Sequence, residues 1–343
     1  MPLKLYTAKS YLPENKTHTI MLYPFWGNPE DDITNPDYGR FDSYVQAGKN
    51  IFEIVAEPSE AAAFLLPFEF SFDTESLIQV KHLDNLAKQY NKKIITFYNS
   101  DFDKALPIAN AIIFRTSFYK SKKKPNEYAI PGWSANFLTS ETKNLLPALV
   151  KPKDPVISYC GYIDYITLKQ RFHWWRIYKK VMRKTEKMQE IGPILRGKAI
   201  RTLLKDKRIK TNFIIRNGFW AAGMDKKTAR NEYIKNMMNA DYALVVRGAG
   251  NFSYRLYEAL SLGKIPVFID TDCVLPFDNF IDWKKYVVWI NENEISNISQ
   301  KLIEFHNRLS TKEYNELKLN CRKLYEEWIC PLAFFSNIHK YII

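Results

Sequence analysis

The sequence predicts an α/β protein with two Rossmann-like lobes that face each other across a cleft. Short apolar runs alternate with helical segments in both halves, which is typical of parallel sheets. A proline-rich stretch at residues 145–155 separates the two series, and the length of 343 residues exceeds what one core usually covers. We expect a first lobe over residues 1–150, a second over 151–320, and a C-terminal helical segment over 321–343 that could pack on the first.

The first half contains the periodicities of a parallel sheet with covering helices. In the helix expected over residues 74–90, apolar side chains recur every three to four residues, Thr74 is the expected N-cap, and Asn91 ends the helix. The loops that follow the strands should form the working edge of the sheet. Strands are expected at 19–24, 51–55, 62–67, 94–98 and 111–115, and a further helix at 41–47.

The second half repeats the alternation. Gly263 is expected to end a helix that begins at Ser253, because glycine commonly occupies the residue after a helix. Strands are expected at 156–159, 211–216, 241–246, 265–269 and 287–290. Helices are expected at 168–190, 228–238, 253–262 and from 295 to about 328.

The composition is that of a globular protein with an excess of positive charge. Apolar residues make up 46% of the chain, and the formal net charge is +13. The basic residues are densest at 179–210. A solvated helix face explains this stretch, and peripheral docking on an anionic membrane is the alternative. No nucleic-acid-binding pattern accompanies the charge, so we expect no nucleic-acid partner.

The cysteines and the N-terminal sequence point to the cytoplasm. Cys160, Cys273, Cys321 and Cys330 are scattered without zinc-site spacing, which favours reduced thiols. We recognise no secretory signal and no apolar run of about 20 residues that could span a bilayer. We therefore expect a cytoplasmic protein.

The segment Arg-Gly-Ala-Gly-Asn at residues 247–251 follows a predicted strand, and Phe-Ser then opens a helix. Gly248 and Gly250 permit close approach of the backbone to a phosphate, and the helix offers free N–H groups. Arg247 and Arg255 add charge, Ser253 adds a hydroxyl, and Asn251 lies in the same loop. No Gly-Lys-Ser/Thr follows, and Ser253 stands where a dinucleotide motif has its third glycine. The pattern therefore predicts an anion site of another kind.

Glu258 and Arg216 are further candidates for this site. Glu258 could bind a ribose, or form an ion pair with Arg255 three residues before it. Arg216 ends the strand at 211–216 and could bind a second phosphate, or form a surface ion pair. The sequence leaves both alternatives open.

The run from Arg247 to Trp283 resembles the C-terminal half of the exostosin family of glycosyltransferases. Weaker similarity is seen at residues 62–68 and at Tyr159-Cys160-Gly161 with Arg171. The resemblance implies the GT-B arrangement, in which the first lobe (residues 1–150) binds the acceptor. The second lobe (residues 151–320) would then bind a nucleotide-diphosphate sugar, favoured to be a UDP-sugar. The resemblance also implies inverting transfer to a carbohydrate acceptor without a metal or other cofactor. The matching residues are Arg247, Gly248, Ser253, Arg255, Glu258, Ala259, Leu260, Gly263, Pro266, Val267, Leu275, Pro276, Phe277, Asp282 and Trp283.

An inverting transfer needs a base that deprotonates the acceptor hydroxyl. Glu69 and Asp73 lie in the loop after the strand at 62–67, and Asp73 could instead cap the next helix. Asp31 and Asp32 are the next choice. Asp101-Phe102-Asp103 resembles a D-x-D metal motif, but we interpret it as a chance match and expect no metal ligands. The alternatives to an enzyme are a phosphate-binding module without turnover and, less favoured, a basic nucleic-acid-binding protein.

Overall fold

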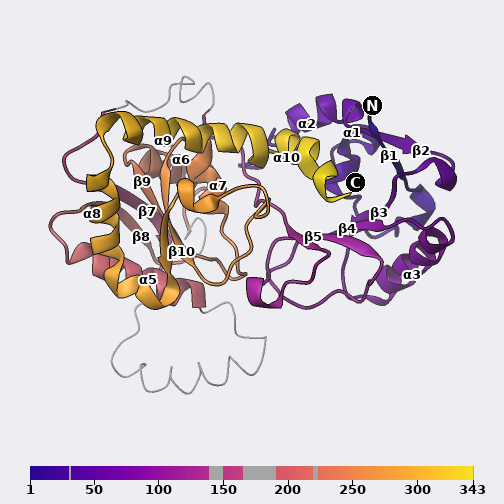
Figure 1. Ribbon diagram of the computed structural model, residues 1–343, viewed down its shortest axis with the longest axis horizontal. Helices are drawn as coiled ribbons and strands as arrows, with labels where there is room; N and C mark the ends of the chain where they lie inside the picture. Colours follow the sequence, from indigo (N-terminus) through magenta and orange to yellow (C-terminus); the bar gives the residue numbers. More distant parts are fainter. Residues whose placement is uncertain (31, 139–149, 165–190, 219–222, 343) are drawn as a thin grey trace, which may run out of the picture. The chain divides into compact units, whose positions relative to one another are not determined.

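The computed structural model describes residues 1–30, 32–138, 150–164, 191–218 and 223–342 (Figure 1). These residues form two compact units. The first contains Met1–Ala135, Val274–Phe277 and Glu327–Ile343, and the second contains Asn136–Cys273 and Asp278–Glu326. Each unit has its own parallel sheet with helices between the strands, so the predicted two Rossmann-like α/β lobes are confirmed.

The first unit contains a six-stranded sheet of order β2-β1-β3-β4-β5-β6, in which every neighbouring pair is parallel. The strands expected at 94–98 and 111–115 are confirmed with the same limits. The strands are β1 (Leu3–Tyr6), β2 (Phe52–Val55), β3 (Ala63–Glu69), β4 (Ile94–Tyr98), β5 (Ala111–Arg115) and β6 (Glu127–Ala129). The helices are α1 (Tyr23–Trp26), α2 (Asp42–Ala47), α3 (Thr74–Gln89) and α10 (Pro331–Asn337).

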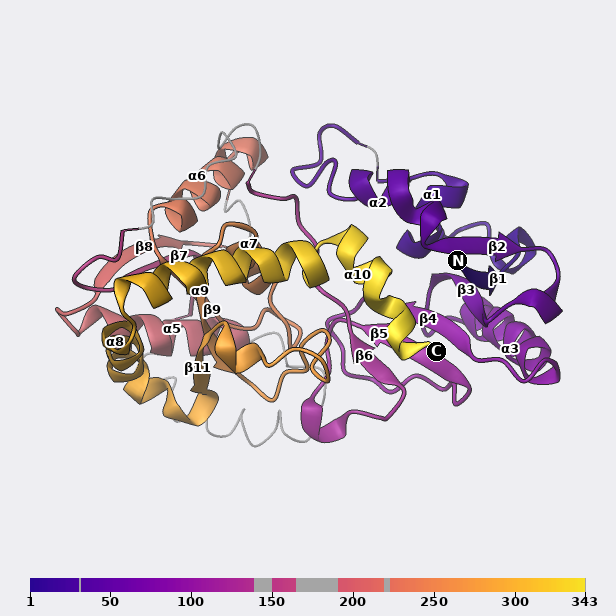
Figure 2. The same cartoon turned by 45° about the horizontal axis from the view of Figure 1, so that its top comes forward.

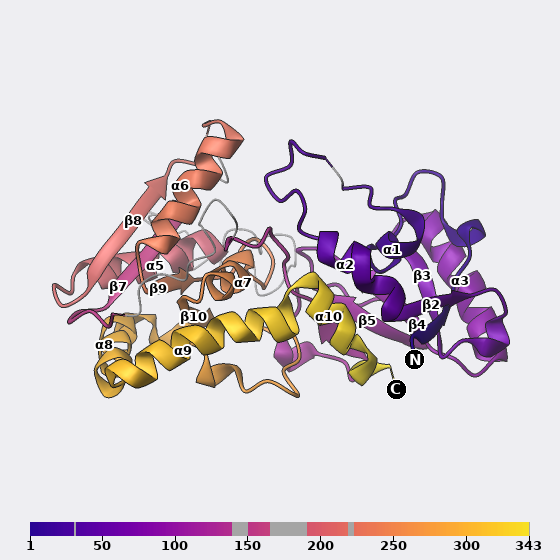
Figure 3. The ribbon, with the colours of Figure 1, turned by 90° about the horizontal axis from the view of Figure 1, so that it is seen from above.

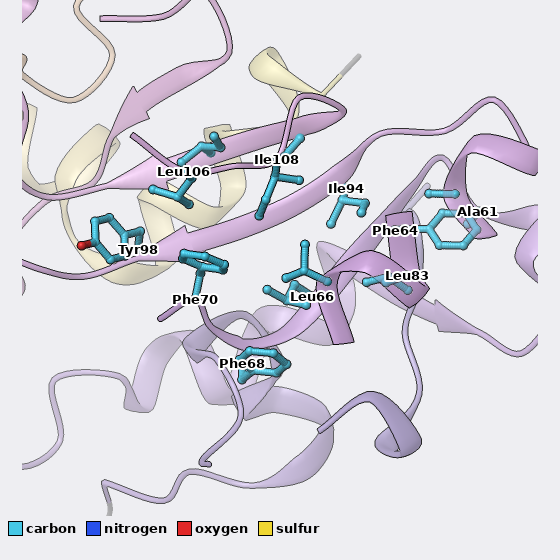
Figure 4. Close-up of a cluster of buried hydrophobic side chains, with 14 of the residues drawn as sticks. Ala61, Phe64, Leu66, Phe68, Phe70, Leu83, Ile94, Tyr98, Leu106 and Ile108 are labelled. Atoms are coloured by element: carbon cyan, nitrogen blue, oxygen red, sulfur yellow. The ribbon is translucent and has the colours of Figure 1, made fainter. Parts of the chain in front are cut away.

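Helices cover both faces of this sheet because successive side chains of a strand point to opposite sides. On one face, Leu66 and Ile94 pack with Leu83 of α3 in an apolar core (Figure 4). On the other face, the ring of Phe97 lies 6.2 Å from that of Phe335 in α10. Helix α10 also packs beside α2 (Figure 2). The sheet is therefore buried from both sides.

Two expectations for the first unit are wrong. Residues 19–24 form a 3-10 helix (Ile20–Leu22) followed by α1, and the first strand is instead β1. Pro24 fits the first turn of a helix but cannot donate to a sheet ladder, and a short apolar run cannot by itself distinguish strand from helix. The N-cap of α3 is Asp73 and not Thr74, because the Asp73 carboxylate accepts a hydrogen bond from the Ser76 N–H at 2.9 Å.

The second unit contains a five-stranded parallel sheet of order β11-β10-β9-β7-β8. Helix α6 runs beside β7 and β8 (Figure 3), and α5 lies on the opposite face from α6 and α7 (Figure 1). The strands are β7 (Val156–Tyr162), β8 (Lys210–Arg216), β9 (Tyr242–Val245), β10 (Ile265–Asp270) and β11 (Val288–Asn291). The helices are α5 (Ile191–Leu204), α6 (Lys226–Met238), α7 (Tyr254–Ser261), α8 (Ile298–Arg308) and α9 (Thr311–Leu324).

The expected end of α7 is confirmed. Gly263 has φ +60°, which glycine adopts without strain, and the N–H of Lys264 returns to the Ala259 carbonyl at 2.9 Å. The helix expected at 168–190, with Arg171, lies outside the described residues. No helix in the described ranges is both long enough and apolar enough to cross a bilayer.

Candidate functional site

The segment at residues 247–253, here called the glycine loop, lies at the carboxyl edge of the second sheet, between the end of β9 and the start of α7. The N–H of Gly248 closes this loop on the Phe252 carbonyl at 2.8 Å. In the sheet, β7 has β8 on one side and β9 on the other, so the chain order reverses between β7 and β9. Open parallel sheets bind ligands at such a switch point, outside the carboxyl ends of the strands. The loop therefore lies where this fold places its ligands.

Arg247 and the glycines shape the inner part of the loop. Arg247 is 4% exposed, and its Nη2 donates to the Ala249 carbonyl at 3.0 Å. A Cβ on Gly248 would meet its nearest neighbour, the Phe252 oxygen, at 3.7 Å, so this side of the loop has room. Gly250 is buried in the same loop. Arg247 thus supplies a buried positive charge at the loop, and the backbone at Gly248 is open to the approach of a ligand.

Asn251 holds the loop in place. Its side-chain amide donates to the Thr271 carbonyl at 3.1 Å, and its Oδ1 accepts from the Thr271 hydroxyl at 2.6 Å. Asn251 is fully buried. These bonds connect the loop after β9 to the segment after β10, so the side chain of Asn251 positions the site.

Ser253 occupies the N-cap of α7 in an extended conformation, and its side chain makes no capping hydrogen bond. The hydroxyl and the first N–H groups of α7 therefore stand at the same helix end. The first turn of a helix carries unsatisfied donors and a partial positive charge, both of which favour an anion. This geometry suits the role that the sequence predicts for Ser253.

A polar network on α6 and α7 connects Arg255 to Glu258. Arg255 Nε donates to the hydroxyl of Tyr233 at 3.1 Å, and that hydroxyl donates to Glu258 Oε2. Glu258 is 4% exposed, and its Oε1 pairs with Nη1 of Arg230 at 3.3 Å. Arg255 also donates to the Cys160 carbonyl at the end of β7. In place of the ion pair between Arg255 and Glu258 that the sequence left open as the alternative, the two side chains are bridged by the Tyr233 hydroxyl.

Arg216 ends β8, as expected, but its charge already has a partner. Its Nη2 donates to Glu232 Oε2 at 2.9 Å and to the Ala229 carbonyl at 2.8 Å. This is the ion pair that the sequence left open as the alternative. The charge of Glu232 weakens the case for a phosphate contact by Arg216.

In the first unit, Glu69 lies at the carboxyl end of β3 beside an ion pair. Burial, and then the negative charge of Glu30, raise the pKa of Glu69 to about 7, while Arg40 opposes the shift. Glu30 pairs with Arg40 and accepts a hydrogen bond from the Tyr23 hydroxyl at 3.1 Å. A carboxylate whose pKa lies near neutral pH is suited to accept a proton.

Asp73 is engaged in structure. It caps α3, and its Oδ2 pairs with Lys16 at 2.8 Å. The hydrogen bond from Lys16, and then that from Ser71, hold the pKa of Asp73 well below its ordinary value. Asp32 likewise accepts from the N–H of Thr34 at 2.9 Å in a turn, and Asp31 lies outside the described residues. Glu69 is therefore the stronger candidate base.

A known protein family matches part of the second unit. The model of the exostosin GT47 domain matches residues 188–304. This segment is therefore similar to an exostosin GT47 domain.

Individual relatives agree with this assignment at modest identity. An exostosin-1 homolog of Caenorhabditis elegans is 27% identical over 128 residues, which cover 35% of this chain and 32% of that protein. A probable glucuronosyltransferase of rice (Oryza sativa) and a probable β-1,4-xylosyltransferase of Arabidopsis thaliana are each 38% identical over 63 residues, which cover 18% of this chain and 15% of theirs. The chain thus spans a third or less of these relatives.

The GT47 segment contains the glycine loop, Arg255 and Glu258 but neither Glu69 nor Asp73. The family match therefore bears on the second unit alone.

Sequence reasoning missed two features of the second unit. Tyr233 and Arg230 gave no signal, because a tyrosine and an arginine on an amphipathic helix are ordinary. Asp270-Thr271-Asp272 is a D-x-D sequence directly at the end of β10, and the sequence alone could have revealed it. Within the described ranges, no group of three or more His, Cys, Asp or Glu side chains is arranged to hold a metal ion.

Proposed function

We propose that the protein is a glycosyltransferase that moves a sugar from a nucleotide-diphosphate donor, favoured to be a UDP-sugar, to a hydroxyl group of a glycan, polysaccharide or lipid-linked acceptor. The observation that carries the proposal is the glycine loop at the switch point of a GT47 segment, with Arg247 and Arg255 beside it. The names of the plant relatives include glucuronosyl and xylosyl transfer, so the transferred sugar is left open.

The residues of the second unit suit the departure of a diphosphate. In an inverting transfer, the acceptor oxygen bonds to the anomeric carbon while the bond from that carbon to the diphosphate oxygen breaks. The negative charge then grows on the nucleoside diphosphate. The guanidinium groups of Arg247 and Arg255 and the N-terminus of α7 would stabilise this charge. We propose that they do so without a metal ion.

We assign the base to Glu69. The acceptor hydroxyl loses its proton as it attacks, and a carboxylate with a pKa of about 7 can take that proton near neutral pH. Glu258, which Arg230 and Tyr233 hold in place, is proposed to bind the ribose. A half-buried carboxylate with a raised pKa is typical of acid–base catalysis, which favours an enzyme over a binding module without turnover.

The test is transfer from a panel of UDP- and GDP-sugars to oligosaccharide acceptors, run with and without EDTA. We expect release of nucleoside diphosphate from at least one sugar donor, unchanged by EDTA. Thermal-shift measurements on the same panel test binding separately. If no nucleotide sugar stabilises the protein or is turned over, the proposal fails.

A further inference from the structure

The loops that follow β4 and β5 lie side by side at the carboxyl edge of the first sheet. The two strands are parallel neighbours, so their carboxyl ends meet at this edge. The Ser117 hydroxyl donates to the Asp101 carbonyl at 2.9 Å, and Lys122 Nζ pairs with Asp103 Oδ2 at 3.2 Å. The two loops therefore form one continuous surface.

Arg115, the last residue of β5, connects both loops from the inside. Its side chain is 1% exposed, and its Nη1 pairs with Glu127 Oε1 at 2.8 Å. Its Nη2 donates to the carbonyls of Phe102 and Ser117, each at 3.1 Å. Removal of one partner from a buried ion pair is strongly destabilising, so this pair gives the loops a fixed conformation.

These loops expose more positive than negative charge. Asp103 is 7% exposed, and Asp101 is half-buried. Glu127 is 3% exposed, and its Oε2 accepts the backbone N–H of Lys124 at 2.9 Å, so this carboxylate lies inside the loop. Lys120 and Lys124 form no ion pair with any residue that the structure describes. The exposed lysines of the two loops include Lys104, Lys120, Lys122 and Lys124.

An exposed aromatic ring accompanies these lysines. Phe102 is 49% exposed, although Arg115 holds its carbonyl. Two residues further, Lys104 has its Nζ 3.7 Å from the ring centroid of Phe72, in the loop that follows β3. Phe72 comes three residues after Glu69. The exposed surface thus extends to the loop beside the proposed base.

Exposed lysines beside an exposed aromatic ring suit the surface of an anionic bilayer. The negative potential of anionic headgroups attracts lysines, and an aromatic ring can enter the boundary between headgroups and acyl chains. Duplex nucleic acid also attracts lysines through its phosphates, but its bases are stacked inside, and the ring of Phe102 would add nothing to such binding. The exposed ring therefore favours a lipid surface.

We propose that the first unit docks on an anionic lipid bilayer through Phe102, Lys104, Lys120, Lys122 and Lys124, here called the lysine surface. This surface is separate from the basic stretch at 179–210, which belongs to the second unit. Docking goes beyond the proposed function and does not depend on it. One consequence does rest on that function: docking brings Glu69 towards the membrane, which favours the lipid-linked acceptor among those proposed.

The test measures binding of the full chain to phosphatidylcholine vesicles with and without phosphatidylserine, by co-sedimentation at low and at high salt. We expect binding to the vesicles that contain phosphatidylserine and loss of that binding at high salt. Lys120→Gln/Lys124→Gln should weaken binding by about 10- to 30-fold, because each lysine near an anionic surface contributes roughly fivefold. The matched control is Lys49→Gln/Lys81→Gln, which removes the same charge from η3 (Gly48–Asn50) and α3 and should bind like the wild type.

Phe102→Ser distinguishes a bilayer from nucleic acid. We expect this variant to bind vesicles several-fold more weakly than the wild type, because it loses the ring that enters the bilayer. If Lys120→Gln/Lys124→Gln binds vesicles like the wild type, the docking role is disproved. If Phe102→Ser binds vesicles like the wild type while the double lysine variant loses binding to duplex DNA, the partner is nucleic acid and the proposal is overturned.

The outcomes separate docking from the proposed function. If vesicle binding depends on the lysine surface but no nucleotide sugar is bound or transferred, docking stands and the proposed function fails. If a sugar is transferred but vesicle binding does not depend on the lysine surface, the proposed function stands and docking fails. If both hold but a soluble oligosaccharide is a better acceptor than the same oligosaccharide linked to a lipid in the vesicles, the choice of acceptor is wrong.

Discussion

Arg255 donates a hydrogen bond from Nε to the hydroxyl oxygen of Tyr233 over 3.1 Å. Through this bond, α6 fixes the guanidinium that α7 carries towards the end of β7. Tyr233 uses its own proton to bond Glu258, so one hydroxyl sets the spacing between the proposed phosphate and ribose contacts. The donor site therefore depends on a side chain that need not touch the donor.

Tyr233→Phe should weaken UDP binding while the fold is retained. The substitution leaves Arg255 Nε and Glu258 Oε2 each short of one partner, which we expect to destabilise the protein by about 1–3 kcal/mol. UDP affinity should fall several-fold because Arg255 loses its fixed orientation. Chemical denaturation and calorimetry measure the two effects. Unchanged affinity at the expected loss of stability would mean that Arg255 needs no positioning by Tyr233.

Arg255→Ala and Arg216→Ala should have very different effects on the affinity for UDP. We expect Arg255→Ala to reduce UDP affinity by about 10- to 100-fold, as expected for loss of charge-assisted hydrogen bonds. Arg216→Ala should change it by less than about threefold, because Arg216 is paired with Glu232. Titration calorimetry of both variants makes the comparison, and equal losses in the two would contradict the site as described.

Substitution of alanine for Gly192 or for Gly248 should have different effects on stability and on UDP binding. A Cβ at Gly192 would lie 2.4 Å from the Gly248 oxygen and 2.6 Å from the Arg247 oxygen, so α5 or the loop must shift. We expect Gly192→Ala to lower stability by about 1–3 kcal/mol. Gly248→Ala meets its nearest atom at 3.7 Å and should fold normally, yet it should weaken UDP binding by crowding the phosphate. Thermal melting and UDP titration distinguish the two, and normal UDP binding by Gly248→Ala would argue against a close backbone approach.

Glu69→Gln should abolish transfer but preserve donor binding. Loss of a general base typically costs about 10²- to 10⁴-fold in rate. In the wild type, the rate should rise with pH through about 7, where Glu69 loses its proton. Steady-state kinetics across pH 5.5–8.5 measure this, with Asp73→Asn, at the cap of α3, as the comparison for stability effects. A Glu69→Gln enzyme with wild-type turnover would remove Glu69 from the mechanism.

The raised pKa of Glu69 should also make the free energy of unfolding depend on pH. Because folding raises the pKa of Glu69 from 4.5 to about 7, the folded state holds this proton more tightly than the unfolded state does. The contribution of Glu69 to stability is therefore full below about pH 4.5 and is lost as the pH rises through about 7, by roughly 3 kcal/mol. Denaturant titrations of wild type and Glu69→Gln between pH 4.5 and 8 should show this loss in the wild type only. Parallel pH dependence in both proteins would contradict the burial of Glu69.

Elements whose structure is determined by periodicity and local chemistry were predicted correctly from the sequence. The strands β4 and β5, the end of α7 at Gly263 and the loop at residues 247–253 were predicted in place. Local reasoning was wrong at residues 19–24, because a buried apolar run with one proline fits a strand and a helical turn alike. It also could not find Tyr233, whose role arises from a contact with Arg255, 22 residues further along the chain.

The most direct test of the central claim is a crystal structure of the protein with UDP bound. We predict that the diphosphate lies against the loop at residues 247–253, at the N-terminus of α7, within hydrogen-bonding distance of Arg247 and Arg255. A diphosphate bound at any other edge of the second sheet, with both arginines unengaged, would contradict this account.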